Sequence, residues 1–334
     1  MKCFHHLALG TLLVLASPCV ASLEAAAEAP APKKVAILLF DEVEIIDYTG
    51  PYEVFGANDA FEVYTVAASP AAVTTAMGMK VIPKYSFADA PAADVVVIPG
   101  GGVDRVQSDP ATLDWIKTQA AHAEHVLSVC NGAFTLANTG LLAGLKSTTT
   151  SGNIDTLRRR HPEITVLRDQ RVVDNGKIVT AGGLSAGIDG ALHVMSTMLG
   201  EGEARDVAQM LEYDWHPEGG YLPATFASHV LPRADTKLAA IIHSQTVLST
   251  TGDADHWTKV WRVSSDLNSA DLLKQAGAIF ADAGHWTAVE AAASATNWHF
   301  VDSDDKPWDA TLSVGNTPGQ AGKYLVTIAL ARAN

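Results

Sequence analysis

The sequence predicts an α/β domain whose parallel β-sheet is flanked by helices, followed by a smaller α+β domain with an antiparallel sheet. Through most of the chain, short apolar runs alternate with helical patterns, which is typical of a parallel sheet covered on both faces. In about the last hundred residues, strand patterns follow one another through turns, with one helical segment among them. That order predicts a compact α+β unit.

The N-terminus has the pattern of a secretory signal peptide, and we expect residues 1–22 to be removed on export to the periplasm or the medium. Lys2 precedes an uncharged apolar run from Leu7 to Ala16, and small residues follow. A run of about ten residues is too short for a bilayer, which needs roughly 20. No stable membrane span is therefore expected. Residues 23–33 lack periodicity and are expected to form a flexible linker.

Buried strands and amphipathic helices predict that the α/β domain spans residues 34–215. The strand candidates are Val35–Phe40, Phe61–Ala67, Val95–Pro99, Val126–Val129 and Ile178–Thr180. The helix candidates are Pro51–Ala57, Pro110–Ala121, Ala133–Ala143, Ala186–Leu199 and Glu201–Tyr213. A sheet of this flavodoxin-like type binds its ligands at the carboxyl ends of its strands.

The accessory α+β domain is expected at residues 236–334, after a connector at residues 216–235. Its strand candidates are Gln245–Thr251, Trp257–Ser264, Thr296–Asp302, Trp308–Val314 and Tyr324–Ala331. An amphipathic helix is predicted to begin at Ser269. Because aromatic residues dominate small cores, we expect the tryptophans of this domain to form its interior. They are Trp257, Trp261, Trp286, Trp298 and Trp308.

Composition excludes several classes of partner. The 334 residues are 48% hydrophobic, which is enough for one sizeable core and a second, smaller one. The formal net charge is −14, so the surface repels phosphate backbones and anionic head groups. The accessory domain also lacks a basic recognition helix. Nucleic acid is therefore not an expected partner.

The cysteine count directs attention to one residue. Cys3 and Cys19 lie in the segment expected to be removed, which leaves Cys130 alone in the mature chain. Lipoprotein processing at Cys19 is the less favoured alternative, because Pro18 precedes it directly. A lone thiol in an exported protein is either buried and inert or retained for its chemistry.

The segment around Cys130 favours a reactive thiol. Residues 126–133 predict a buried strand that ends at Cys130 and turns at once into a helix, with Gly132 easing the tight bend. This arrangement lifts the side chain to the carboxyl edge of the sheet. It also places the sulfur at a helix N-terminus, where the partial positive charge favours the thiolate.

Two other segments end at the same edge of the sheet. Ile98–Gly102 places three consecutive glycines after a buried strand, which lets the backbone approach a ligand closely; a plain turn is the alternative. Asp47 follows the first strand and precedes a predicted helix. It either caps that helix or reaches the cysteine as a proton shuttle, with a pKa raised by partial burial.

These motifs together resemble the ThiJ/PfpI superfamily of class I glutamine amidotransferase-like folds. The matching segments are Asp47–Pro51, Pro99–Gly102, Ser128–Phe134, Arg159–Pro162 and Ala181–Asp189. They look most like the isonitrile hydratase branch, which also supplies the ligand-sensing halves of some AraC-type regulators. The resemblance covers a little over half of the chain.

The resemblance implies a cysteine-dependent hydratase or lyase that acts on a small electrophilic carbon, without a cofactor or metal, in a homodimer. It implies that Cys130 is the nucleophile and Asp47 the carboxylate beside it. It also implies that Gly101 and the backbone of Asn131 bind an anion. The other residues expected to line the ligand site are Gly102, Gly132, Ser185 and Asp189, although Asp189 is alternatively a capping or pairing group within its turn.

Two departures from the family pattern narrow this expectation. Asn131 stands where hydratase-like members have threonine, and an amide cannot relay a proton as a hydroxyl can. Residues 147–153 contain no histidine where many relatives have one, which argues against amidase or protease chemistry of the Cys-His type. The remaining alternatives are a small-metabolite binding module and a redox sensor that uses Cys130.

Because His122 and His125 flank Glu124 without a metal-binding pattern, we expect a solvated helix end there.

Overall fold

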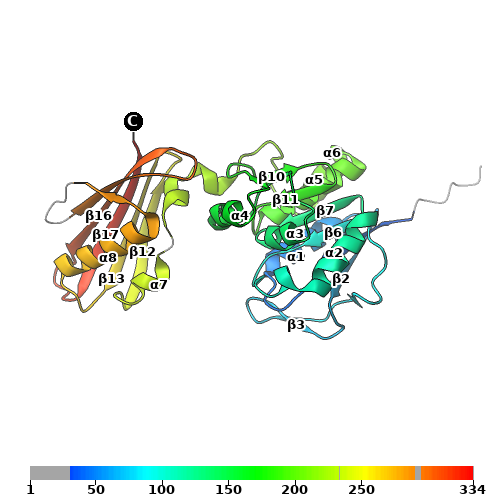
Figure 1. Ribbon diagram of the computed structural model, residues 1–334, viewed down its shortest axis with the longest axis horizontal. Coiled ribbons are helices and arrows are strands. Elements are labelled where there is room, and N and C mark those ends of the chain that lie inside the picture. The colour runs from blue at the N-terminus through cyan, green and yellow to red at the C-terminus, as the bar shows by residue number, and fades with distance from the viewer. Residues whose placement is uncertain (1–30, 233, 290–294, 334) are drawn as a thin grey trace, which may run out of the picture. The chain divides into compact units, whose positions relative to one another are not determined.

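Continuous apolar strands form the centre of a seven-stranded sheet in the first domain (Figure 1). The structure is a computed structural model that describes residues 31–232, 234–289 and 295–333. The predicted signal peptide and residues 23–30 of the predicted linker lie outside these ranges. The strands of the sheet, in spatial order, are β10 (Val172–Asp174), β11 (Ile178–Ala181), β7 (His125–Val129), β6 (Val95–Ile98), β1 (Lys33–Leu38), β2 (Phe61–Ala67) and β5 (Tyr85–Ser86).

All neighbouring strands of this sheet run parallel except β10 and β11, which are antiparallel. Helices cover both faces, as the sequence predicts. They are α1 (Ile45–Gly56), α2 (Pro110–His122), α3 (Gly132–Asn138), α4 (Ile154–Arg160), α5 (Ala186–Leu199) and α6 (Glu201–Met210). The shorter strands β3 (Val73–Thr74), β4 (Lys80–Val81), β8 (Lys146–Ser147) and β9 (Thr165–Val166) form two small ribbons.

The packing of β1 between two layers of helices explains why residues 35–38 are all apolar. Val35 and Ile37 belong to the core shared with α1, α5 and α6. Ala36 and Leu38 belong to the core shared with α2, α3 and α4. All four side chains are fully buried. A strand covered by helices on both faces cannot alternate polar and apolar residues, because either face would then bury a polar side chain.

The predicted α+β domain is confirmed as a six-stranded antiparallel sheet with one long helix. Its strands, in spatial order, are β12 (Ser244–Gly252), β13 (His256–Ser264), β17 (Lys323–Arg332), β16 (Pro307–Asn316), β15 (Ala295–Val301) and β14 (Thr287–Ala288). Helix α8 (Ser269–Gly284) packs on β15 and β16, and α7 (Asp235–Leu238) precedes the sheet. Four of the five tryptophans are buried in this core, and Trp261 packs against it half-buried.

The structure corrects the bounds of three predicted helices. α1 begins at Ile45 rather than Pro51, so Asp47 lies inside its first turn instead of before it. α3 ends at Asn138 instead of Ala143, because Gly140 follows with a φ of 83° that does not continue a helix. α6 ends at Met210 instead of Tyr213, because Glu212 follows with a φ of 52° that does not continue a helix. α8 begins at Ser269 as predicted, after Asn268, whose side chain caps the helix by accepting a hydrogen bond from the Asp271 N–H.

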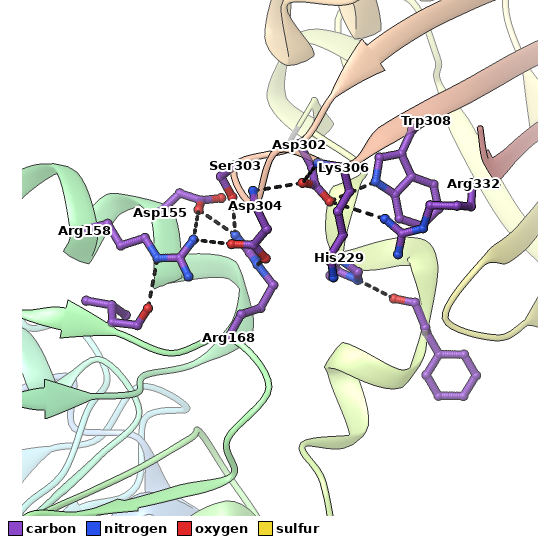
Figure 2. Close-up of polar contacts among 12 residues, drawn as sticks. Asp155, Arg158, Arg168, His229, Asp302, Ser303, Asp304, Lys306, Trp308 and Arg332 are labelled. Carbon is purple, nitrogen blue, oxygen red and sulfur yellow. Dashed lines mark hydrogen bonds and ion pairs between the residues drawn. The ribbon is translucent and has the colours of Figure 1, made fainter. Parts of the chain in front are cut away.

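A cluster of charged residues joins α4 and the bend after β9 to the turn between β15 and β16. Arg158 and Arg168 form ion pairs with the same carboxylate, Asp304, at 2.8 and 3.1 Å. Figure 2 shows these three side chains. Arg168 also contacts Asp155 at 2.6 Å and Ser303 at 2.6 Å. Burial alone would raise the pKa of Asp304, but the two guanidinium groups lower it. These arginines are therefore engaged within the chain.

Among the described residues, no helix is both long enough and apolar enough to cross a bilayer. The same residues contain no cluster of three or more His, Cys, Asp or Glu side chains that suits a metal ion.

Candidate active site

Cys130 lies at a sharp turn between β7 and α3. Its φ is 58°, a left-handed backbone conformation that residues other than glycine rarely adopt and that costs roughly 1–2 kcal/mol. The turn is held because the Cys130 N–H donates to the carbonyls of Ala181 and Gly182, at 3.2 and 3.0 Å, and its carbonyl accepts from the Thr149 hydroxyl. Such strain persists only where the surroundings fix it, and it is concentrated at functional sites.

Gly132 permits the close approach that this turn requires. A Cβ atom at this position would lie 2.2 Å from the Ile98 carbonyl oxygen and 2.7 Å from that of Pro99. Both atoms belong to the backbone at the end of β6. The first turn of α3 therefore lies directly against that backbone, and only glycine leaves room for this close packing.

Asp47 is fully buried and lies beside the sulfur. Its Oδ1 accepts a hydrogen bond from the Leu184 N–H at 2.9 Å, and its Oδ2 accepts one from the Gly100 N–H at 3.1 Å. The Cys130 thiol is its third hydrogen-bond partner. Asp47 therefore does not cap α1, whose N-cap is Glu44. The structure brings Asp47 and Cys130 together, as the sequence predicts.

Burial sets the protonation of this pair. It raises the pKa of Asp47 to about 6, against the opposing effect of its three hydrogen bonds. Burial also raises the pKa of the Cys130 thiol, and the negative charge of Asp47 raises it further. At neutral pH the pair is thus a carboxylate that accepts a hydrogen bond from a protonated thiol. The expectation that the start of α3 favours a resting thiolate is wrong, because burial and the charge of Asp47 both raise the pKa of the thiol.

The glycine segment after β6 uses its N–H groups within the protein. The Gly101 N–H donates to Asn131 Oδ1 and the Gly101 carbonyl accepts from Asn131 Nδ2, both at 2.8 Å. The Gly102 N–H donates to the Glu42 carbonyl at 2.8 Å. The geometry therefore does not support Gly101 and Gly102 as amides poised for an anion. The Asn131 backbone N–H differs, because it donates toward the Cys130 sulfur.

Ser185 and Asp189 belong to a neighbouring polar cluster. Arg171 forms an ion pair with Asp189, and the Tyr213 hydroxyl donates to Asp189 Oδ2 at 2.8 Å. Arg171 Nη2 also lies 3.3 Å from Ser185 Oγ. Within the described part of the chain, both predicted residues make their side-chain contacts in this cluster rather than with Cys130. Two other residues of this turn reach the site through their backbone: the Leu184 N–H donates to Asp47, and Gly183 lies against the sulfur, where a Cβ atom would be 3.0 Å from Cys130 Sγ.

Two side chains at the site were not predicted from sequence. Thr150 hydrogen-bonds to the Cys130 sulfur, and it lies in the segment that was notable only for lacking histidine. Tyr221, in the predicted connector, is 5% exposed, and its hydroxyl oxygen accepts from the Ser151 N–H at 3.1 Å. The only sequence signal at Tyr221 is an aromatic residue after Gly219 and Gly220 in a polar stretch.

Comparison with known proteins agrees with the fold and the motifs. The DJ-1/PfpI family profile matches residues 33–197. An isonitrile hydratase from Pseudomonas putida is 36% identical over 220 residues, which cover 65% of this chain and 94% of that protein. A ThiJ/PfpI family protein from Pseudomonas syringae has a crystal structure with a TM-score of 0.52 and 30% identity, covering 56% of this chain and 78% of that one.

DJ-1beta from Drosophila melanogaster supports the fold alone. Its crystal structure is matched over its whole length and over 55% of this chain, with a TM-score of 0.50 and 20% identity. The family resemblance inferred from the five motif segments is thereby confirmed. The chain has a strained cysteine after β7, a buried carboxylate beside it and a hydratase relative that is matched over 94% of its length. This chain belongs to the DJ-1/PfpI family.

Proposed function

We propose that the protein is an isonitrile hydratase-like enzyme, which adds water to a small isonitrile and releases the N-substituted formamide. The observation that carries this proposal is the contact between the Cys130 thiol and Asp47, whose carboxylate is placed to accept the thiol proton as the sulfur bonds to the substrate. The relative that is an isonitrile hydratase supports the choice of substrate class. No histidine base is needed, because Asp47 contacts the thiol directly.

The proposed reaction has two stages. In the first, Asp47 takes the thiol proton, the sulfur bonds to the terminal carbon of R–N≡C, and the proton is returned to that carbon. The product of this stage is the thioformimidate R–N=CH–S–Cys130. In the second stage, water adds to the same carbon, with its oxygen bonding there and one proton going to nitrogen. Cleavage of the carbon–sulfur bond then releases R–NH–CHO and restores the thiol, with no change in oxidation state.

The direct test is a panel of aliphatic and aromatic isonitriles incubated with the purified mature protein. We expect N-substituted formamide, detected by NMR with a substrate labelled with ¹³C at the terminal carbon. Intact-mass measurement under turnover is expected to detect a Cys130 adduct heavier by the mass of the substrate. Absence of formamide across the whole panel would contradict the proposal.

Turnover should fall in acid because Asp47 must be ionised to accept the thiol proton. With a pKa of about 6, the ionised fraction drops about tenfold for each pH unit below that value. We expect kcat/KM to rise up to about pH 6 and then to stay level to pH 8, measured by initial rates in overlapping buffers. A profile that rises instead between pH 8 and 9 would point to a free thiolate as the controlling group.

The redox-sensing alternative is weakened by the raised pKa of the Cys130 thiol, because peroxide reacts with the thiolate. Export, removal of residues 1–22 and homodimer formation stay predictions.

A further inference from the structure

The accessory domain contains a cavity on the part of its sheet against which α8 does not pack. α8 packs on β15 and β16, toward one end of the sheet. Over β13 and β17, a cavity of about 130 Å³ lies between the sheet, α8 and the end of α7 with the turn after it. The side chains around the cavity are mainly apolar, and they include Leu238, Ile242, Ala276, Phe280, Trp261 and Val326.

The cavity suits a small hydrocarbon group. A cavity of about 150 Å³ that is lined by aliphatic and aromatic side chains is large enough to bind benzene, so a chain of about six carbons has a suitable size here. The cavity opens to solvent along the edge strand β12, where Gln245 and Val247 line it and Val247 is 51% exposed. A ligand can therefore enter without unfolding of the domain.

Among the described residues that line this cavity, Lys259 alone is charged. Lys259 belongs to β13 and pairs with Ile328 on β17, which is fully buried. Residues directly opposite each other in an antiparallel pair point to the same face, so Lys259 lies on the core face of the sheet. The Lys259 ammonium lies 5.0 Å from the centre of the Trp261 ring. Val263, four residues further along β13, also lines the cavity.

Neither ion pairing nor edge protection within the domain explains a lysine at this position. The described residues that line the cavity include no carboxylate. Inward-pointing charges protect the edge strands of sheets, but β13 lies between β12 and β17. A lysine on a core face is costly unless an anion pairs with it. Because the formal net charge of −14 repels anions elsewhere, attraction for an anion is local to this cavity.

We propose that this cavity binds a short-chain carboxylic acid, whose hydrocarbon chain lies against Trp261 and Val263 and whose carboxylate pairs with Lys259. Burial of the chain supplies affinity through the hydrophobic effect. The single charged group fixes the orientation of the ligand, as in most small-molecule sites. The inference goes beyond the proposed function, because every residue that lines the cavity follows residue 230 and Cys130 is not among them.

The test is the affinity of the full protein for hexanoate and hexanamide, measured by isothermal titration calorimetry at neutral pH. Hexanamide has the same chain without the charge. We expect the wild type to bind hexanoate about tenfold more tightly than hexanamide, since a hydrogen bond to a charged group is the stronger one. Lys259→Met keeps an unbranched side chain and should abolish this difference by weakening hexanoate alone. Ala276→Leu fills part of the cavity from α8 and should weaken both probes.

Lys323→Met and Ala278→Leu are the matched controls. Lys323 is an exposed residue of β17 that precedes the buried Tyr324, so its side chain lies on the opposite face of the sheet. Ala278 is an exposed residue of α8 that does not line the cavity. Both variants should bind hexanoate as the wild type does.

Absence of saturable hexanoate binding by the wild type would overturn the inference. So would a hexanoate affinity that Lys259→Met or Ala276→Leu leaves unchanged. Because the readout is binding rather than turnover, the result does not depend on the proposed hydration of isonitriles.

Discussion

Cys130→Ala is expected to abolish turnover, with at least a 1,000-fold loss in kcat, while the protein stays folded. Among the residues that the structure describes, the Cys130 sulfur is the only nucleophile whose side chain hydrogen-bonds to Asp47. Removal of a covalent nucleophile leaves only the residual effect of binding. Alanine keeps the backbone at φ 58° no worse than cysteine does. Formamide release and circular dichroism, measured on the same preparation, check both halves of this prediction.

Ser128→Ala provides the control for this experiment. Ser128 lies two residues earlier on β7, is fully buried, and its hydroxyl has no hydrogen-bond partner among the described residues. Its removal should leave turnover unchanged. Formamide release by Cys130→Ala at more than a small percentage of the wild-type rate would show that the sulfur is not the nucleophile.

The ionised form of Asp47 destabilises the folded protein, although the proposed reaction requires it. Its folded pKa of about 6 exceeds the reference value of 3.8 for the unfolded chain, so the native state binds more protons between these values. Its contribution to stability is most favourable below about pH 4 and is lost as the pH rises through 6. The ionised group then costs on the order of 3 kcal/mol. A residue that only capped a helix would not be buried at this cost.

The fold could be predicted from sequence because its determinants are local patterns. β2 and α5 have the bounds that their apolar periodicity predicts. The association of Cys130 with Asp47 was predictable too, because the carboxyl ends of β1 and β7 meet at one edge of the sheet. The start of α1 was misjudged, since Pro51 normally marks a first turn but here lies further inside the helix.

Side-chain pairings across the site could not be predicted, because they depend on tertiary contacts between distant segments. Nothing in the local sequence indicates that the Asn131 amide occupies both polar groups of Gly101. The raised pKa of Cys130 arises from burial, which a strand-to-helix pattern does not reveal. The same holds for Tyr221, which is separated from Ser151 by 70 residues in the chain.

Gly132→Ala is expected to lower the free energy of unfolding of the α/β domain by about 3 kcal/mol. The added methyl group would be 2.2 Å from the Ile98 carbonyl oxygen, and the obstacle is backbone, which no rotamer change can relieve. α3 must move away from β6, which opens the packing of the fully buried Ala133 and Leu136. Denaturant unfolding, followed in parallel with the wild type, measures this loss.

Gly202→Ala distinguishes a steric cause from a general effect of adding a methyl group. A Cβ atom at Gly202, in α6, has no atom within 4 Å, so this substitution should be neutral or stabilise the helix by up to about 1 kcal/mol. Equal unfolding free energies for Gly132→Ala and the wild type would mean that α3 does not lie against the end of β6. In that case the turn at Cys130 would not be held in its left-handed conformation by the contact between α3 and β6, and the sulfur would not be fixed beside Asp47.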